Sequence, residues 1–106
     1  MLRGILYELV QADDLGATVR LLPDSTVYAG HFPGYPITPG VCLVQIALEL
    51  IGHGGLVAAK NIKFTSPVFP GEGAVLRFSI SGEGEDRSVE VYDGEVLSAK
   101  MSLTLA

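Results

Sequence analysis

Residues 30–50 read GHFPGYPITPGVCLVQIALEL, and this stretch decides the fold. A segment rich in proline and glycine leads into a nearly unbroken apolar run. We expect a helix that starts at or just after Pro39, because proline suits a helix N-terminus, and that runs to about Ile51. The glycines of the following GHGG segment then provide a left-handed cap. Nearly every position of this helix is apolar, which is typical of a buried helix.

Alternation of apolar and polar residues predicts strands on both sides of this helix. The expected strands are residues 3–11, 16–22, 56–64, 74–81, 87–92 and 95–105, and residues 23–38 are expected to be irregular. Asp93-Gly94 predicts a tight hairpin between the last two strands. In the final strand, Leu97, Ala99, Met101, Leu103 and Leu105 should face inward, and Ser98, Lys100, Ser102 and Thr104 outward.

The order of elements, two strands, one helix and four strands, predicts an α+β fold in which about six antiparallel strands wrap around one central helix. The 106 residues suit a single domain, residues 1–106, with a modest core. A small sheet of this kind leaves open edges, which pairing with another subunit would cover. We therefore expect a homodimer or a higher even oligomer.

Composition narrows the classes of partner. The formal charge of −5 argues against nucleic acid as a partner, because few phosphates could be neutralised. No apolar run approaches the ~20 residues that span a bilayer. The N-terminal residues lack the pattern of a secretory signal, and Cys42 is the single cysteine, so we expect a cytoplasmic protein.

Two motifs carry a resemblance to a known family. His31-Phe32-Pro33-Gly34, Pro36 and Pro39-Gly40 match the pattern H-F-P-G-x-P-x-x-P-G, and residues 63–72, KFTSPVFPGE, resemble K-F-x-x-P-V-x-P-G-D. Both patterns are typical of the β-hydroxyacyl-(acyl carrier protein) dehydratases, which have the hotdog fold. The resemblance extends from about residue 5 to the C-terminus.

The resemblance implies roles for several residues. Dehydration of a β-hydroxyacyl thioester needs a base for the proton beside the carbonyl, donors for the developing oxyanion, and an acid for the departing hydroxyl. By the resemblance, His31 is the base, and its pKa range near neutrality suits that role. The oxyanion would lie at the helix N-terminus, on the backbone N–H of Gly40. Val41, Phe32 and Pro39 complete the oxyanion and substrate-binding set.

The acid is replaced. The family carries Asp or Glu where this chain has Gln45, and many members carry Gln where this chain has Glu49. The two positions share one helix face, about 6 Å apart along the axis. Glu49 could serve as an acid whose pKa is raised by burial. Alternatively, it is a carboxylate hydrogen-bonded to Gln45, or part of a wet stripe with His53, and we favour this second interpretation.

Other candidate groups receive structural interpretations. Cys42 lies among apolar neighbours, so we expect a packed thiol and not a nucleophile. His53 follows the helix and suits a C-terminal cap. His31 and His53 have no further ligand at the right spacing, so we expect no metal, and the motifs call for no cofactor.

We therefore predict a dehydratase-type hydro-lyase of fatty-acid or related acyl synthesis, with Gln45 in place of the usual acid. The alternatives are a module that binds an acyl thioester or its carrier protein, or a non-catalytic subunit of a mixed dimer; an acyl thioesterase is less favoured. The sequence leaves open the chain length and the choice between carrier protein and coenzyme A. A patch that includes Lys60, Lys63 or Arg77 would suit an acidic carrier.

Overall fold

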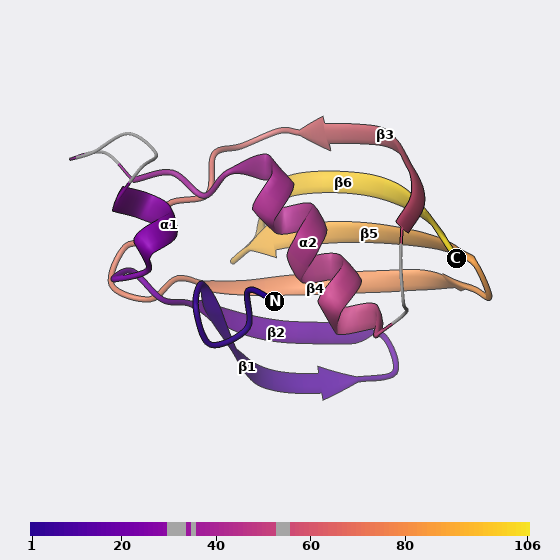
Figure 1. Ribbon diagram of the computed structural model, residues 1–106, viewed down its shortest axis with the longest axis horizontal. Coiled ribbons are helices and arrows are strands. Elements are labelled where there is room, and N and C mark those ends of the chain that lie inside the picture. Colours follow the sequence, from indigo (N-terminus) through magenta and orange to yellow (C-terminus); the bar gives the residue numbers. More distant parts are fainter. Residues whose placement is uncertain (30–33, 35, 53–55) are drawn as a thin grey trace.

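The computed structural model describes residues 1–29, 34, 36–52 and 56–106. Six antiparallel strands form one sheet, and the long helix lies across one of its faces (Figure 1). The elements are β1 (Tyr7–Asp13), β2 (Gly16–Leu21), α1 (Thr26–Ala29), α2 (Gly40–Ile51), β3 (Leu56–Phe64), β4 (Val75–Glu83), β5 (Asp86–Asp93) and β6 (Val96–Leu105). The strand order β1-β2-β4-β5-β6-β3 leaves β1 and β3 at the edges. The predicted α+β class and the central helix are confirmed.

The helix has the bounds expected from its sequence. Pro39 stands at its N-cap with an extended backbone, and Gly52 closes it with a φ of 79°. At this positive φ a residue without a side chain is favoured, and the Gly52 N–H donates to the carbonyl of Leu48. Proline and glycine therefore set the two ends of α2.

Two segments differ from expectation. The first strand begins at Tyr7 and not at residue 3. The reason is that Gly4 has a φ of 84° and its N–H donates a hydrogen bond to the carbonyl of Tyr7, three residues later. Residues before β1 therefore form a tight turn. The segment expected to be irregular contains a short helix, α1, in which Tyr28 is buried.

The core lies between α2 and the inner face of the sheet. α2 contributes Leu43, Ile46 and Ala47, which are at most 2% exposed. From the sheet, the fully buried apolar side chains are Val19, Leu21, Leu76, Phe78, Val89, Val91, Ala99, Met101, Leu103 and Leu105. The strict alternation of these residues along their strands leaves mostly polar side chains on the opposite face of the sheet, with exposed apolar residues such as Val75 among them.

Ser98 breaks the predicted alternation of the last strand. It was expected to face solvent but is 1% exposed, because the register of β5 and β6 shifts next to it. Val91 pairs with Ala99 and Tyr92 pairs with Leu97, so Ser98 is an extra residue in β6. Its carbonyl accepts the N–H of Thr65 beyond the end of β3. This bulge ties the segment after β3 to the sheet.

Within a single chain, the helix is not buried on every side. Val41 is 74% exposed, and Gln45, one turn further on, is also exposed. The sheet of a single chain covers only one side of α2. The edge strand β3 also exposes Ile62 and Phe64. Among the described residues, no helix is both long and apolar enough to cross a membrane.

Candidate functional site

The N-terminus of α2 opens into a cleft of about 400 Å³. Pro39 and Gly40 line it, together with Phe64 and the residues that follow β3. Among the described residues, no side chain caps this helix end, so backbone N–H groups of its first turn, such as those of Gly40 and Val41, are oriented toward a ligand site. The helix dipole favours negative charge at this point. His31 and Phe32, which belong to the same motif, lie outside the described residues, as does His53.

Two hydrogen bonds hold the segment that leads into α2. Thr38 is 4% exposed, and its hydroxyl lies 2.8 Å from the hydroxyl of Tyr28 on α1. The Thr38 N–H donates to the carbonyl of Val68 at 2.8 Å. Burial raises the pKa of Tyr28, so this phenol stays neutral. The short helix that the sequence did not predict therefore positions the start of α2.

Phe64 is a site residue that the sequence analysis did not single out. Its ring lies directly against the Cα of Gly40, so that a Cβ at position 40 would be 2.5 Å from the Phe64 Cζ. Phe64 belongs to the second motif, residues 63–72, and this was the only signal in the sequence. The contact explains the glycine at the start of α2, since any side chain would need the ring to move.

The predicted hydrogen bond between Gln45 and Glu49 is confirmed, and it is part of a larger network. The Gln45 Nε2 donates to the Glu49 Oε2 at 2.9 Å. Three further donors reach the same carboxylate: the N–H of Leu2 at 2.8 Å, the N–H of Arg3 at 3.1 Å and the Tyr7 hydroxyl at 2.9 Å. Glu49 therefore attaches the turn before β1 to α2.

The expectation of a raised Glu49 pKa is wrong. Burial alone would raise it, but the bonds from Leu2, Gln45, Tyr7 and Arg3 together hold the pKa of Glu49 below its usual range. The pKa of Tyr7 is raised, by burial first and then by the hydrogen bond to Glu49. Glu49 is therefore an ionised acceptor that carries no proton to donate near neutral pH.

Gln45 and Glu49 lie away from the cleft at Gly40. Glu49 lines a separate cavity of about 260 Å³ together with Tyr7 and Arg3. Gln45 lies on the exposed side of α2, on the same face as Val41. Among the described residues of one chain, Gln45 and Glu49 thus do not line the cleft at Gly40.

Cys42 behaves as a packed thiol. It is partly buried against the core, and burial raises the pKa of its thiol. A raised pKa lowers the thiolate fraction, which is the reactive form. The interpretation of Cys42 as a structural residue and not a nucleophile agrees with this environment.

Comparison with known families and proteins gives consistent matches. The family model described as ApeI-like, ApeI dehydratase, matches residues 8–101. The 3-hydroxyacyl-(acyl-carrier-protein) dehydratase FabZ of Erythrobacter litoralis is 36% identical over 85 residues, covering 63% of this chain and 56% of the relative. The FabZ of Rhizorhabdus wittichii is 31% identical over an alignment of 116 positions, which covers 92% of this chain and 73% of the relative. The chain thus spans between about half and three quarters of these relatives.

Two solved structures share the fold. A chain of the dehydratase heterocomplex ApeI:P from Xenorhabdus doucetiae superimposes with a TM-score of 0.67 at 23% identity, covering 93% of this chain and 94% of that one. An uncharacterized protein from Erwinia carotovora subsp. atroseptica gives a TM-score of 0.60 at 22% identity, covering 93% and 90%. These likenesses establish the hotdog fold.

The Phe64 ring against Gly40 generates the first prediction. Gly40→Ala should destabilise the chain by up to about 1 kcal/mol, because the added methyl group displaces the Phe64 ring, which is half exposed and can shift. Phe64→Ala removes the ring, so the free energy of unfolding of the double variant should fall by less than the sum of the two single losses. Urea unfolding of the wild type and the three variants measures this coupling. If the stability losses of the two single variants add up to that of the double variant, the contact between Phe64 and Gly40 is contradicted.

The Glu49 network generates a second prediction. A carboxyl whose pKa is lowered on folding stabilises the fold above its ordinary value of 4.5 and loses this contribution as the pH falls through the folded-state pKa. The unfolding free energy of the wild type should therefore fall more steeply below pH 4.5 than that of Glu49→Gln. Urea unfolding at about pH 6 and about pH 3.5 measures the difference.

The matched control for this experiment is Glu72→Gln, an exposed glutamate outside the network. It should keep the acid sensitivity of the wild type. Equal pH dependence in all three proteins would show that Glu49 is not stabilised in its ionised form.

Proposed function

The chain belongs to the ApeI-like dehydratase family, and on this premise we propose that it is a hydro-lyase that removes water from β-hydroxyacyl thioesters. The observation that carries the proposal is the position of the H-F-P-G-x-P-x-x-P-G motif. This motif ends at Gly40, where an uncapped helix N-terminus opens into a cleft. Such an end suits the negative charge that develops on a thioester oxygen during proton removal.

In the proposed reaction, His31 removes the proton from the carbon beside the thioester carbonyl. The electron pair moves onto the carbonyl oxygen, which the Gly40 N–H stabilises, with Val41 next to it on the helix end. The pair then returns to form the carbon–carbon double bond while the β-hydroxyl departs as water, with its proton returned by the His31 imidazolium that the first step formed. Pro39 and Phe32 would shape the walls against which the acyl group lies.

Among the described residues, the site lacks a clear proton donor for the departing hydroxyl. Gln45 has no proton to give, and Glu49 is held ionised by four donors. Because the Gln45 Nε2 donates to Glu49, its carbonyl oxygen and its second N–H remain to bind the hydroxyl. Because Gln45 lies away from the cleft of its own chain, it would meet a leaving group only across a subunit contact, where it would orient the hydroxyl without protonating it. We therefore expect slow turnover from an assembly made of this chain alone.

The proposed substrate is an acyl group on a carrier protein in fatty-acid or related acyl synthesis, in the cytoplasm. The relatives from Erythrobacter and Rhizorhabdus are named for carrier-linked 3-hydroxyacyl substrates. The cleft of about 400 Å³ has room for the reacting end of such a group. Coenzyme A thioesters share the same reacting end and are an alternative source.

A second candidate is a mixed dimer, in which another hotdog subunit provides the acid. Gln45 and Val41 lie on an exposed face of α2, where a partner subunit would be in contact. The solved relative from Xenorhabdus doucetiae is a dehydratase heterocomplex. In this arrangement the chain contributes His31, the base, to one site, and its own Gln45 takes no part in catalysis.

The missing acid generates a third prediction, tested by turnover of a β-hydroxyacyl thioester with detection of both double-bond formation and free thiol. Gln45→Glu should raise dehydration by about 10²-fold or more, the usual contribution of a general acid. Its new carboxyl lies within hydrogen-bond distance of Glu49, and the like charge raises one of the two pKa values, which suits proton donation.

The controls separate the possible mechanisms. Gln45→Glu combined with Glu49→Gln restores the order of the family and should keep the gain, whereas His31→Ala should remove activity from every background. If Glu49→Gln alone abolishes a fast wild-type reaction, Glu49 is the acid and the proposal for Gln45 is wrong. Release of thiol without a double bond would identify a thioesterase.

The exposed face of α2 generates a fourth prediction. We propose that the isolated chain forms a homodimer or a higher even oligomer through the β3 edge and this helix face. Val41→Glu should dissociate the dimer, because it places a charge on the face that the partner would cover. Leu15→Glu is the matched control: Leu15 is 72% exposed and Val41 is 74% exposed, but Leu15 lies in the β1–β2 turn.

Light scattering at micromolar concentration measures the mass of each protein. A monomeric wild type would contradict the homodimer and would favour the mixed dimer.

A further inference from the structure

A buried pair of hydroxyl groups lies beside the cleft at Gly40. Thr38, on the segment before α2, is 4% exposed, and Tyr28, on α1, is 5% exposed. Their hydroxyl oxygens lie 2.8 Å apart. Thr38 lines the cleft, whereas Tyr28 belongs to the hydrophobic core. One member of the pair therefore adjoins the site and the other does not.

The pair has one more hydrogen than its contact can use. Each hydroxyl group carries one hydrogen, and a contact between two hydroxyl groups engages only one of them. The Tyr28 phenol is neutral because burial raises its pKa, so it keeps its hydrogen. Within the part of the chain that the structure describes, neither hydroxyl group has a second partner. One buried O–H group of the pair is thus without an acceptor there.

The spare hydrogen belongs to Thr38. If Thr38 donated to Tyr28, the phenol hydrogen would be left among the apolar side chains of the core, and an unpaired buried donor is destabilising. If Tyr28 donates to Thr38, the spare hydrogen lies at the wall of the cleft, where a bound molecule can accept it. The phenol is also the stronger acid of the two groups and hence the better donor.

The fold holds Thr38 in place for such a contact. Its N–H donates to the carbonyl of Val68, another residue of the cleft, at 2.8 Å. Its hydroxyl oxygen is held by Tyr28, and donation from the phenol polarises the Thr38 O–H and strengthens it as a donor. A donor that is already fixed loses little conformational entropy when a ligand binds.

The other hydroxyl groups of the cleft are less suited to this contact. The Thr65 Oγ1 donates to the carbonyl of Leu97 at 2.6 Å, so its hydrogen is already used. Ser66 is only half-buried, and no residue in the described ranges holds its hydroxyl group in one orientation. Thr38 is therefore the fixed hydroxyl donor among the described residues of the cleft.

Thr38 also has a suitable position relative to Gly40. Pro39, which separates them, has an extended backbone with a φ of −59° and a ψ of 140°. The Cα atoms of Thr38 and Gly40 are therefore roughly 6–7 Å apart. In a β-hydroxyacyl thioester, the hydroxyl group is attached two carbons from the carbonyl group. One bound acyl group can therefore contact both the helix end and Thr38.

We propose that the Thr38 hydroxyl donates a hydrogen bond to the β-hydroxyl oxygen of the acyl group while the Gly40 N–H binds the carbonyl oxygen, which rests on the proposed function. Thr38 then determines specificity, because a saturated acyl group of the same length leaves its O–H unpaired. Thr38 transfers no proton in this arrangement. It orients the hydroxyl group that later departs as water.

The probes are the 3-hydroxyoctanoyl and octanoyl thioesters of N-acetylcysteamine. Their binding is measured by NMR titration in a His31→Ala background, which prevents turnover. Tyr28→Phe combined with Thr38→Val should weaken binding of the hydroxyoctanoyl thioester by about three- to tenfold and leave octanoyl binding unchanged. Both hydroxyl groups are replaced by apolar groups of similar shape, so urea unfolding should show nearly unchanged stability.

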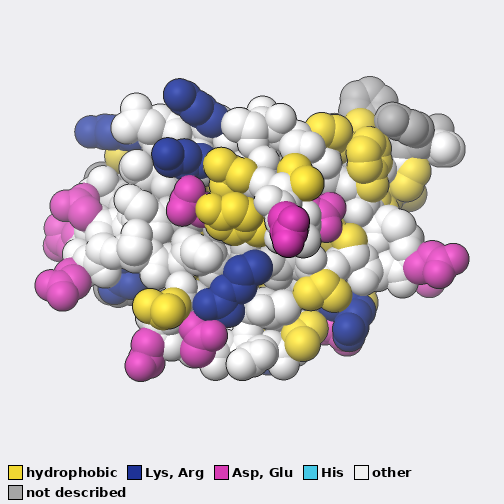
Figure 2. Space-filling model, turned by 180° about the vertical axis from the view of Figure 1, so that it is seen from behind, with side chains coloured by type: hydrophobic (Ala, Val, Ile, Leu, Met, Phe, Trp, Pro, Cys, Tyr) yellow, Lys and Arg dark blue, Asp and Glu magenta, His cyan; other side chains and the backbone are white. Residues whose placement is uncertain are grey.

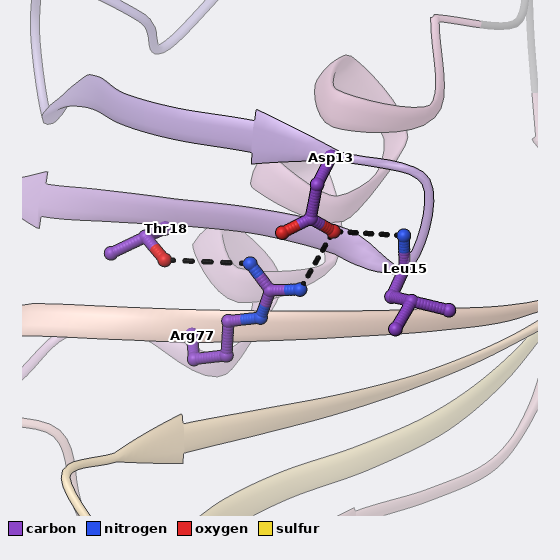
Figure 3. Close-up of polar contacts among 4 residues, drawn as sticks. All are labelled: Asp13, Leu15, Thr18 and Arg77. Atoms are coloured by element: carbon purple, nitrogen blue, oxygen red, sulfur yellow. Dashed lines mark hydrogen bonds and ion pairs between the residues drawn. The ribbon is translucent and has the colours of Figure 1, made fainter.

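Thr18→Val is the matched control. Thr18 is also a partly buried threonine with a hydrogen-bonded hydroxyl group, which accepts from Arg77 at 3.5 Å, while Arg77 donates to Asp13 at 3.0 Å (Figure 3). Its neighbours Ala17 and Val19 are buried on the inner face. Thr18 therefore belongs to the outer face of the sheet, which Figure 2 shows with its charged side chains. This variant should bind both thioesters like its parent.

A conservative variant tests whether the hydroxyl group itself is responsible. Thr38→Ser keeps the donor and should keep the preference for the hydroxyoctanoyl thioester, and loss of the preference in this variant would contradict the proposal. If the double variant fails to fold, Thr38→Val alone decides. The ratio of the two affinities within one protein does not depend on the folded fraction.

Two results for the double variant overturn the proposal. Equal weakening of both thioesters would identify Thr38 as a wall of the cleft, and unchanged binding of both would identify a purely structural pair. Turnover tests the proposed function separately. A wild type that forms no double bond, combined with a preference for the hydroxyoctanoyl thioester that depends on Thr38, contradicts the dehydratase and supports the Thr38 contact. Binding of neither thioester contradicts both.

Discussion

The packing of α2 across one face of the sheet is the constraint on which the rest of the structure depends. Leu43, Ile46 and Ala47 meet the inward side chains of the strands, and alternation along each strand then leaves the other face mostly polar. This single contact decides three features at once. It places the helix N-terminus at a cleft beside the end of β3, and it leaves Val41 and Gln45 uncovered. It also leaves the outer face of the sheet exposed to solvent, where charged side chains can lie.

Glu49 shows how hydrogen-bond donors decide the role of a carboxyl group on a helix. A carboxylate has about four acceptor positions, and four donors occupy them here: two backbone amides, a phenol and the amide of Gln45. Each donor favours the ionised form, and together they outweigh the effect of burial. The carboxyl group has thus become a structural attachment for the N-terminal turn. The hydrogen bond from the Gln45 Nε2 to Glu49 also fixes the orientation of the Gln45 amide.

The sequence predicted the elements whose signals are local. Pro39 and Gly52 marked the ends of α2, and alternation located the strands that the structure confirms. Features that depend on distant partners were missed or wrong. The pKa of Glu49 is set by Leu2, Arg3 and Tyr7, more than forty residues away in the chain. Ser98 is buried because of a register shift, and Phe64 meets Gly40 only through the sheet. No periodicity or spacing encodes these contacts.

The site is divided in a way that follows from this geometry. The cleft at Gly40 is formed within one chain: Phe64 walls it, and the hydrogen bond between Thr38 and Tyr28 holds the segment that leads into it. Gln45, the residue that the proposed function puts in the place of the acid, lies on the open face of α2. One end is therefore fixed by the fold, whereas the other depends on what covers the helix. A subunit that brings a carboxyl group to this face would change the rate of the final proton transfer and leave the binding of the thioester unaltered.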